Sequence, residues 1–202
     1  MDRGQIAALT SCLIVTSASA ARAEGKNTHD GFFLRLSLGP SFSSVESDSS
    51  PKAKISGMGT YFGVAIGGMI AENFGIFGDV SSVRVNGPEL TYGNETVEAD
   101  DSFSVSLSGL GVGVVYYFIP VNVYVSGAIV TDRVIAKDND QKVAESDSGV
   151  GVNLAVGKEW WVSDNWGLGV AGTARVSQMD DKDSSESLNA NAFGLVFSAT
   201  YN

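Results

Sequence analysis

The 202-residue chain has very little of two residues that often carry catalytic chemistry, cysteine and histidine. It has one cysteine, Cys12, and one histidine, His29. Because Cys12 lies in an N-terminal stretch that we expect to be removed, the mature chain is expected to have neither a disulfide nor a thiol nucleophile. A serine or aspartate nucleophile usually works with a histidine base, and His29 is the only residue that could serve.

Two further absences concern membranes and partners. No run of 18 or more apolar residues follows the first 23 residues, which argues against a transmembrane helix. Positive charge is also scarce, since 13 Lys and Arg stand against 23 Asp and Glu, giving a net charge of −10. Nucleic acids are bound by basic surfaces, so we expect no nucleic-acid partner.

The first 23 residues have the pattern of a secretory signal peptide. Arg3 supplies a basic start, and Ile6–Val15 is largely apolar. Small residues then offer a cleavage site between Ala20 and Ala23. The sequence therefore predicts an exported protein, with a polar periplasmic lead-in over residues 24–30 and one domain over residues 31–202.

Large apolar residues alternate with small or polar ones along the stretch Gly149–Val176. The large residues are Val150, Val152, Leu154 and Val156, followed after the turn Ser163–Asn165 by Trp166, Leu168 and Val170. A period of two predicts two strands, each with one apolar face. The opposite face, made of Gly, Ala, Asn and Thr, is too small for the wet side of a soluble sheet. The pattern is typical of strands with lipid outside and a tight lumen inside.

The same alternation predicts eight strands in all. They are expected at Gly31–Gly39, Met58–Met69, from Phe74, Ser102–Phe118, from Val123, twice within Gly149–Val176, and Ala192–Tyr201. A change of parity at Ser108–Gly109 predicts a β-bulge in the fourth strand. Tight turns alternate with four long polar loops at Ser41–Ser56, Arg84–Asp101, Thr131–Ser148 and Ser177–Leu188. This predicts an all-β fold: an eight-stranded antiparallel up-and-down transmembrane β-barrel with four long extracellular loops.

Aromatic residues crowd the tight-turn end, which is the periplasmic end in barrels of this class. They are Phe74, Tyr116, Phe118, Trp160, Trp161, Trp166 and Tyr201, and we predict that they form a girdle at the membrane boundary. A soluble eight-stranded barrel of the lipocalin kind is the alternative fold. That fold places large apolar residues inside and polar ones outside, whereas the small residues here would make a poor apolar pocket.

Two segments carry a resemblance to a known family. The strand–turn–strand Lys158–Gly169 and the final strand Ala192–Tyr201 resemble the small eight-stranded outer-membrane β-barrels of the OmpA/OmpX type, over nearly all of the mature chain. The final strand is similar to the family's C-terminal assembly signal, although Asn202 follows the aromatic Tyr201. The resemblance implies the outer membrane of a Gram-negative cell and insertion by the barrel-assembly machinery, and we expect a monomer. It implies no particular activity, because one scaffold serves many roles.

Four charged residues fall on the inner face by alternation: Arg35, Asp79, Glu159 and Arg175. The interior of an eight-stranded barrel is just wide enough to be filled by side chains. An unpaired buried ion is very costly, so these charges must be paired. We predict a structural ion-pair network that fills the lumen. A narrow, porin-like channel for ions or small solutes is the alternative.

The four predicted loops hold most of the acidic residues and few large apolar ones. The exceptions are Phe42, Tyr92 and Met179, each alone among polar neighbours. We therefore expect mobile, acidic loops with a structural or surface-interaction role at outer-membrane lipid and lipopolysaccharide. Divalent cations are expected to bind weakly at Asp138–Asp140 and Asp180–Asp183, without a defined metal site.

The predicted topology also bears on catalysis. His29 precedes the first strand on the periplasmic side, whereas the serine and aspartate clusters lie in the opposite loops. One bilayer thickness, on the order of 30 Å, separates them. The sequence thus predicts neither an enzyme nor a cofactor.

Overall fold

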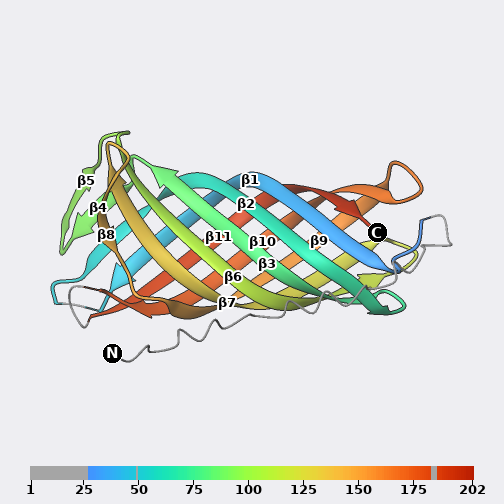
Figure 1. Ribbon diagram of the computed structural model, residues 1–202. Helices are drawn as coiled ribbons and strands as arrows, with labels where there is room; N and C mark the ends of the chain where they lie inside the picture. Colours follow the sequence, from blue (N-terminus) through green and yellow to red (C-terminus); the bar gives the residue numbers. More distant parts are fainter. Residues whose placement is uncertain (1–26, 49, 183–185) are drawn as a thin grey trace, which may run out of the picture.

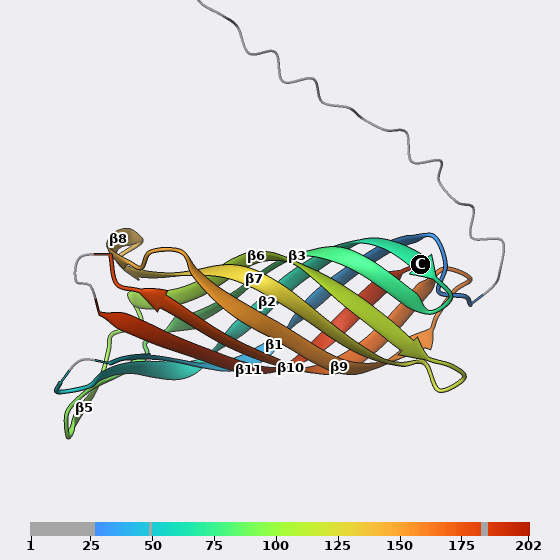
Figure 2. The ribbon, with the colours of Figure 1, turned by 90° about the horizontal axis from the view of Figure 1, so that it is seen from below.

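Eight long strands, each paired with two antiparallel neighbours, close on themselves as a barrel (Figures 1 and 2). The computed structural model describes residues 27–48, 50–182 and 186–202, so the predicted signal peptide lies outside the described residues. The barrel strands are β1 (Phe32–Ser47), β2 (Ala53–Ala71), β3 (Phe74–Asn86), β6 (Phe103–Phe118), β7 (Val123–Asp138), β9 (Gly149–Trp161), β10 (Trp166–Asp180) and β11 (Ser187–Tyr201). Around the barrel the order is β1, β11, β10, β9, β7, β6, β3 and β2, and the pairing of β1 with β2 closes the ring. The predicted eight-stranded antiparallel barrel is confirmed.

The two ends of the barrel differ (Figure 1). Three short strands, β4 (Glu89–Tyr92), β5 (Glu95–Glu98) and β8 (Gln141–Glu145), lie at one end, here named the extended end. At the other, the tight-turn end, short connections join β2 to β3, β6 to β7 and β9 to β10. Asn73 and Asn122 adopt positive φ angles of 60° and 52° in two of these turns, a conformation that asparagine tolerates better than most residues.

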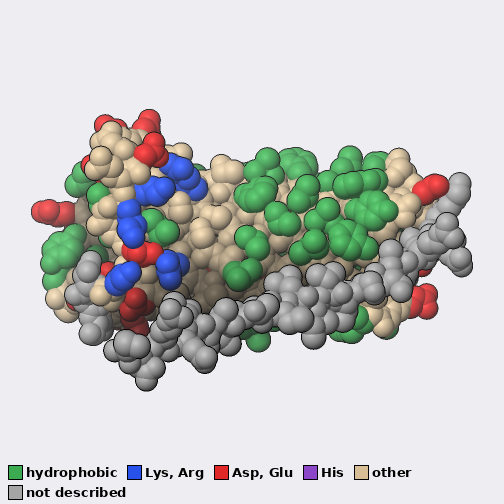
Figure 3. Space-filling model, viewed as in Figure 1, with side chains coloured by type: hydrophobic (Ala, Val, Ile, Leu, Met, Phe, Trp, Pro, Cys, Tyr) green, Lys and Arg blue, Asp and Glu red, His purple; other side chains and the backbone are tan. Residues whose placement is uncertain are grey.

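Alternation along the strands sorts side chains to the two faces, as the sequence predicts. On β9, Leu154 is 52% exposed on the outer face, while Gly151 and Glu159 are buried on the inner face. Small inner residues make room for larger ones: a β-carbon added at Gly113 would lie 2.7 Å from Phe77 Cζ and 2.8 Å from Ala128 Cβ. Figure 3 shows hydrophobic side chains covering the middle and the tight-turn half of the visible face, with Lys and Arg side chains gathered at the extended end.

The strands extend further into the predicted loops than the sequence suggests. The segment Ser41–Ser47, predicted to be loop, continues β1, and its residues pair with both β2 and β11. Its inner side chains Ser41, Ser43, Val45 and Ser47 are all buried. Ser41 Oγ donates a hydrogen bond to the carbonyl oxygen of Phe193 at 3.0 Å, which shows how a small hydroxyl is accommodated inside the barrel. In the same way β7 runs through the predicted loop to Asp138, and β10 runs to Asp180.

The predicted β-bulge at Ser108–Gly109 is wrong. Ser108 pairs with Ser82 on β3 and with Arg133 on β7 without any shift in register. The change of parity therefore reflects a change of environment, because Val105 and Leu107 face inward, where they are 5% and 1% exposed.

These inward residues belong to an apolar core inside the extended end. It contains Val45, Val83, Val105, Leu107, Val134, Ala136, Met179 and Ala190. Met179, predicted to be an isolated apolar residue in a polar loop, is only 3% exposed. The extended end therefore has ordered β-structure around an apolar interior, in place of polar loops that lack a core. In the described part of the chain, no helix is long and apolar enough to cross a membrane.

Candidate functional site: the interior of the barrel

Arg35 on β1 and Glu159 on β9 form an ion pair inside the barrel, on the side of the tight-turn end. Arg35 Nη2 lies 3.3 Å from Glu159 Oε1, and the two side chains are 6% and 0% exposed. Thr200 Oγ1 donates to Glu159 Oε1 at 2.6 Å, and the Tyr117 hydroxyl donates to Oε2 at 3.1 Å. Arg35 in turn donates to the Tyr117 hydroxyl at 2.6 Å and to Thr200 Oγ1 at 3.2 Å. Each charge is thus met by an opposite charge and by hydroxyl groups, as burial requires.

Aromatic rings surround the Arg35 guanidinium. Its Cζ lies 3.6 Å from the centre of the Tyr124 ring and 5.1 Å from the centre of the Phe33 ring. A guanidinium over an aromatic face is attracted to the ring, and more strongly when water is excluded. Tyr117, Tyr124 and Phe33 are each at most 1% exposed, so this layer fills the cross-section of the barrel with large side chains.

His29 covers this layer from the tight-turn end. Its ring stacks on Tyr117, with centroids 3.4 Å apart and planes 14° apart, and its Nε2 lies 2.6 Å from Asn122 Oδ1. The side chain is 3% exposed, and this burial lowers the pKa of His29 below its ordinary value. The end of the polar lead-in is therefore packed against the barrel as a lid on the first network.

Trp161 lies on the inner side of this end and departs from the predicted girdle. Its ring centre is 4.9 Å from that of His29. The register of β9 with β10 is continuous from Glu159 to Trp161, so Trp161 keeps the inward parity of Glu159.

The other six predicted girdle residues lie at the tight-turn end with outward parity. Tyr116 and Phe118 pack edge to face at 4.9 Å, and Trp166 and Tyr201 do so at 5.4 Å. Trp160 is 52% exposed, and Phe74 pairs with Tyr116 across β3 and β6.

A second network lies further toward the extended end, around Asp79 and Arg175. Arg175 Nη1 is 3.6 Å from Asp132 Oδ1, with both side chains at most 2% exposed. Arg175 also hydrogen-bonds to Ser81, whose hydroxyl donates to Asp79 Oδ1 at 2.9 Å. Asn153 Nδ2 donates to Asp79 Oδ2 at 3.2 Å. The four predicted lumen charges therefore occupy two groups, Arg35 with Glu159 and Asp79 with Arg175.

Several residues of these networks escape sequence reasoning. Asp132 is the ion-pair partner of Arg175, although it falls within the loop predicted to begin at Thr131. A signal was present, because Val130, Asp132 and Val134 share the inward parity of β7. Tyr117 and Tyr124 also have inward parity on β6 and β7, but parity does not reveal that their rings and hydroxyl groups meet Arg35 across the barrel.

A small cavity lies between the two networks. Its volume is about 40 Å³, and Arg35, Tyr61, Asp79, Tyr124 and Asn153 contribute to its walls. Such a volume accommodates ordered water but not a solute. Within residues 27–48, 50–182 and 186–202, no group of three or more His, Asp or Glu side chains is arranged to hold a metal ion.

Comparisons with known proteins agree with this architecture. The family model described as "Outer membrane protein beta-barrel domain" matches residues 8–200. Neisserial surface protein A is similar in structure with a TM-score of 0.54 and 15% identity, covering 84% of this chain and 96% of that one. The outer membrane protein OprG from Pseudomonas aeruginosa is similar with a TM-score of 0.51 and 10% identity, covering 87% of this chain and 98% of that one. A comparison with curated protein sequences gives no match.

Proposed function

Because the chain belongs to the outer membrane protein beta-barrel domain family, we propose that it is a closed, monomeric scaffold in the Gram-negative outer membrane. Its extended end would face the cell surface and its tight-turn end the periplasm. The observation that carries this proposal is the filling of the lumen by two side-chain networks, one around Arg35 and Glu159 and one around Asp79, Arg175 and Asp132.

The outer face supports a membrane setting. Large apolar side chains such as Phe62, Leu110, Ile129, Leu154 and Phe197 are each more than half exposed around the barrel. Lipid contact removes the cost of exposing such surface to water. The aromatic residues at the tight-turn end match the girdle that membrane barrels place at an interface. We further propose that a signal peptide is removed on export and that the barrel-assembly machinery inserts the chain.

The filled lumen favours a scaffold over a channel. An ion crossing the barrel would have to displace His29 and Tyr117 and then pass the buried Arg35–Glu159 pair. Separating that pair would leave a buried charge without its partner, at a cost of about 3–5 kcal/mol. Conduction would therefore need both networks to rearrange. Because the lumen is filled, we assign any interaction with other molecules to the β-structured extended end, which would face the cell surface.

Planar-bilayer recording of the refolded protein tests this proposal. We expect no steady single-channel openings from the wild type, and heat-modifiable gel migration would show beforehand that the barrel has folded. The informative variant is Arg35→Ala, which removes one charge from the first network. Steady wild-type openings whose conductance changes in Arg35→Ala would contradict the closed scaffold and favour the narrow channel.

A further inference from the structure

Positive charge gathers on one outer face of the extended end, although the chain as a whole carries a net charge of −10. Eight lysine and arginine residues of the described part lie outside the lumen, and five of them are on this face. They are Arg84, Arg133, Lys137, Lys142 and Lys182, here named the basic patch. Figure 3 shows Lys and Arg side chains gathered at this end, beside the hydrophobic band.

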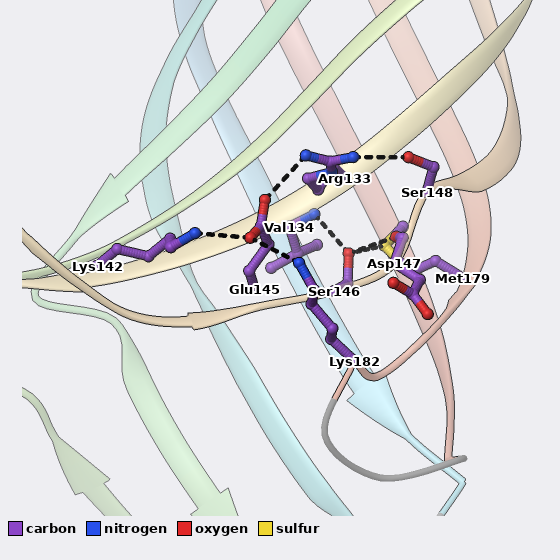
Figure 4. A network of polar contacts seen from close by, with 9 residues as sticks. All are labelled: Arg133, Val134, Lys142, Glu145, Ser146, Asp147, Ser148, Met179 and Lys182. Atoms are coloured by element: carbon purple, nitrogen blue, oxygen red, sulfur yellow. Dashed lines mark hydrogen bonds and ion pairs between the residues drawn. The ribbon is translucent and has the colours of Figure 1, made fainter. Parts of the chain in front are cut away.

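Three of these cations converge on a single carboxylate (Figure 4). Glu145 is 2.9 Å from Arg133 Nη1, 2.7 Å from Lys142 Nζ and 3.3 Å from Lys182 Nζ. Hydrogen bonds from Lys142 and Lys182 lower the pKa of Glu145 to about 2, so it stays ionised at any physiological pH. One negative charge cannot balance three positive ones.

The remaining two cations add to the excess. Arg84 Nη2 lies 3.8 Å from Asp140 Oδ1, at the limit of an ion pair. Lys137 forms no ion pair with a carboxylate of the described residues. Its neighbour Asp138 accepts hydrogen bonds from Ser102 and Asn139 instead. The five cations thus form ion pairs with two carboxylates, Glu145 and Asp140, while Asp138, Asp147 and Asp181 lie near them along the chain.

The register of β3, β6 and β7 fixes the height of the patch above the apolar band. On the outer face, Thr131 of β7 is level with Leu110 of β6, which is 60% exposed. Arg133 is the next outward residue on β7, about 7 Å further along the strand. Arg84 belongs to the row above Arg133, because it pairs with Ser106. Along β7, the first cation of the patch, Arg133, is therefore the next outward-facing residue after the row that contains the exposed Leu110.

Hydroxyl groups fill the space between these cations. Ser82 and Ser108 hydrogen-bond to each other at 2.8 Å in the row of Arg133, and Ser106 lies in the row of Arg84. Guanidinium, ammonium and hydroxyl groups are the donors that phosphate oxygens accept best. The polar headgroups of a bilayer occupy the several ångströms beyond its hydrocarbon core, which is where these donors lie.

We propose that the basic patch binds the phosphate groups of lipids in the leaflet that surrounds the extended end. The inference rests on the membrane orientation proposed above and deepens it. It assigns the anionic lipid to one side of the barrel, over β3, β6, β7 and β8.

Lipid retention by the full chain, folded in a nonionic detergent, tests the proposal. Native mass spectrometry would count bound phosphatidic acid and phosphatidylcholine, which share acyl chains and differ in headgroup charge. The test variant is Arg84→Gln/Arg133→Gln/Lys137→Gln. The matched control, Lys52→Gln/Lys54→Gln/Lys158→Gln, removes three cations outside the patch. None of the six residues lies in the lumen, so all proteins are expected to fold.

We expect the wild type and the control to retain phosphatidic acid in preference to phosphatidylcholine. The test variant should bind phosphatidic acid about 100-fold more weakly at low salt, since each cation near an anionic surface contributes about 1 kcal/mol. Equal retention by the test variant and the control would overturn the proposal. So would complete displacement of the lipid by millimolar pyrophosphate, which would identify a site for soluble anions. The two proposals fail in different experiments. If the scaffold were not closed, the bilayer recordings would show conductance, whereas lipid retention would be unaffected. If the barrel had the opposite orientation in the membrane, it would still insert and retain lipid.

Discussion

Arg35 and Glu159 approach to 3.3 Å although their strands, β1 and β9, are separated around the barrel by β10 and β11. The pair therefore spans the lumen, in contrast to a cross-strand pair on one wall. Each member depends on the other, because neither side chain is more than 6% exposed.

We predict that Glu159→Leu lowers the free energy of unfolding by about 3–5 kcal/mol, because it leaves the Arg35 guanidinium buried without its partner. The double variant Arg35→Met/Glu159→Leu should recover most of that loss, since neither charge then remains. Urea unfolding from lipid vesicles measures both. A double variant no more stable than Glu159→Leu would mean that the pair is not the source of the effect.

Lipid should penalise a charge at the middle of β9. Leu154→Arg is expected to lower the unfolding free energy by about 2–4 kcal/mol, because Leu154 faces outward at mid-strand. Val97→Arg, on β5 at the extended end, is the control and should be nearly neutral. Refolding titrations in vesicles give both values, and equal behaviour of the two variants would refute the outward assignment of Leu154.

Burial of His29 predicts a pH dependence at the tight-turn end. The folded protein holds His29 with a lowered pKa, whereas the unfolded chain has a value near 6.5. Stability from the neutral ring is thus fully present above pH 6.5 and is lost as pH falls below it. Burial is the largest cause of the lowered pKa of His29, while hydrogen bonds with Asn122 and Asn202 and the charge of Glu159 oppose it.

The check is a comparison of unfolding free energies at pH 7.5 and pH 5.5. His29→Gln keeps a hydrogen-bonding side chain that does not titrate, so its pH dependence should be smaller than that of the wild type. An identical slope in the two proteins would assign the effect to other groups.

Two glycines give a test of interior packing. Gly113→Ala is expected to cost about 1–3 kcal/mol, because the added methyl group would meet Phe77 and Ala128 inside contact distance. Gly172→Ala is the control, since a β-carbon there has nothing within 4 Å. If thermal unfolding showed equal losses for both, crowding of the lumen would not explain the inner glycines.

Weak binding of divalent cations at the acidic segments stays a prediction. Asp180→Asn/Asp181→Asn should leave membrane insertion unchanged, because the barrel wall is held by its strands. Calcium titration followed by calorimetry should show weaker binding than in the wild type. Unchanged binding would place the cations elsewhere on the extended end.

The facing of most side chains follows from alternation alone, as Val150 to Val156 illustrate. Strand number and closure follow from alternation together with the order of tight turns and long connections. Strand ends do not. A run such as Ser41–Ser47 is compatible with a loop or a strand. It forms a strand because neighbouring strands pair with it on both sides, as Gly57 and Ala192 do with Ser43. The inner charges Arg35 and Glu159 could be placed by parity, but their pairing across the barrel depends on closure and not on local sequence. Asp132 escapes prediction because the sequence pattern ends its strand before it.

All three tryptophans, Trp160, Trp161 and Trp166, lie at the tight-turn end. In the proposed orientation this end stays on the side from which the chain enters the bilayer, while the extended end crosses it. Indole fluorescence would therefore change when the chain docks at the interface and would be silent on translocation of the far end. Insertion kinetics followed by tryptophan fluorescence alone would therefore report docking of the tight-turn end and not the end of insertion. A fluorescent reporter on β5 or β8 would follow translocation of the extended end separately.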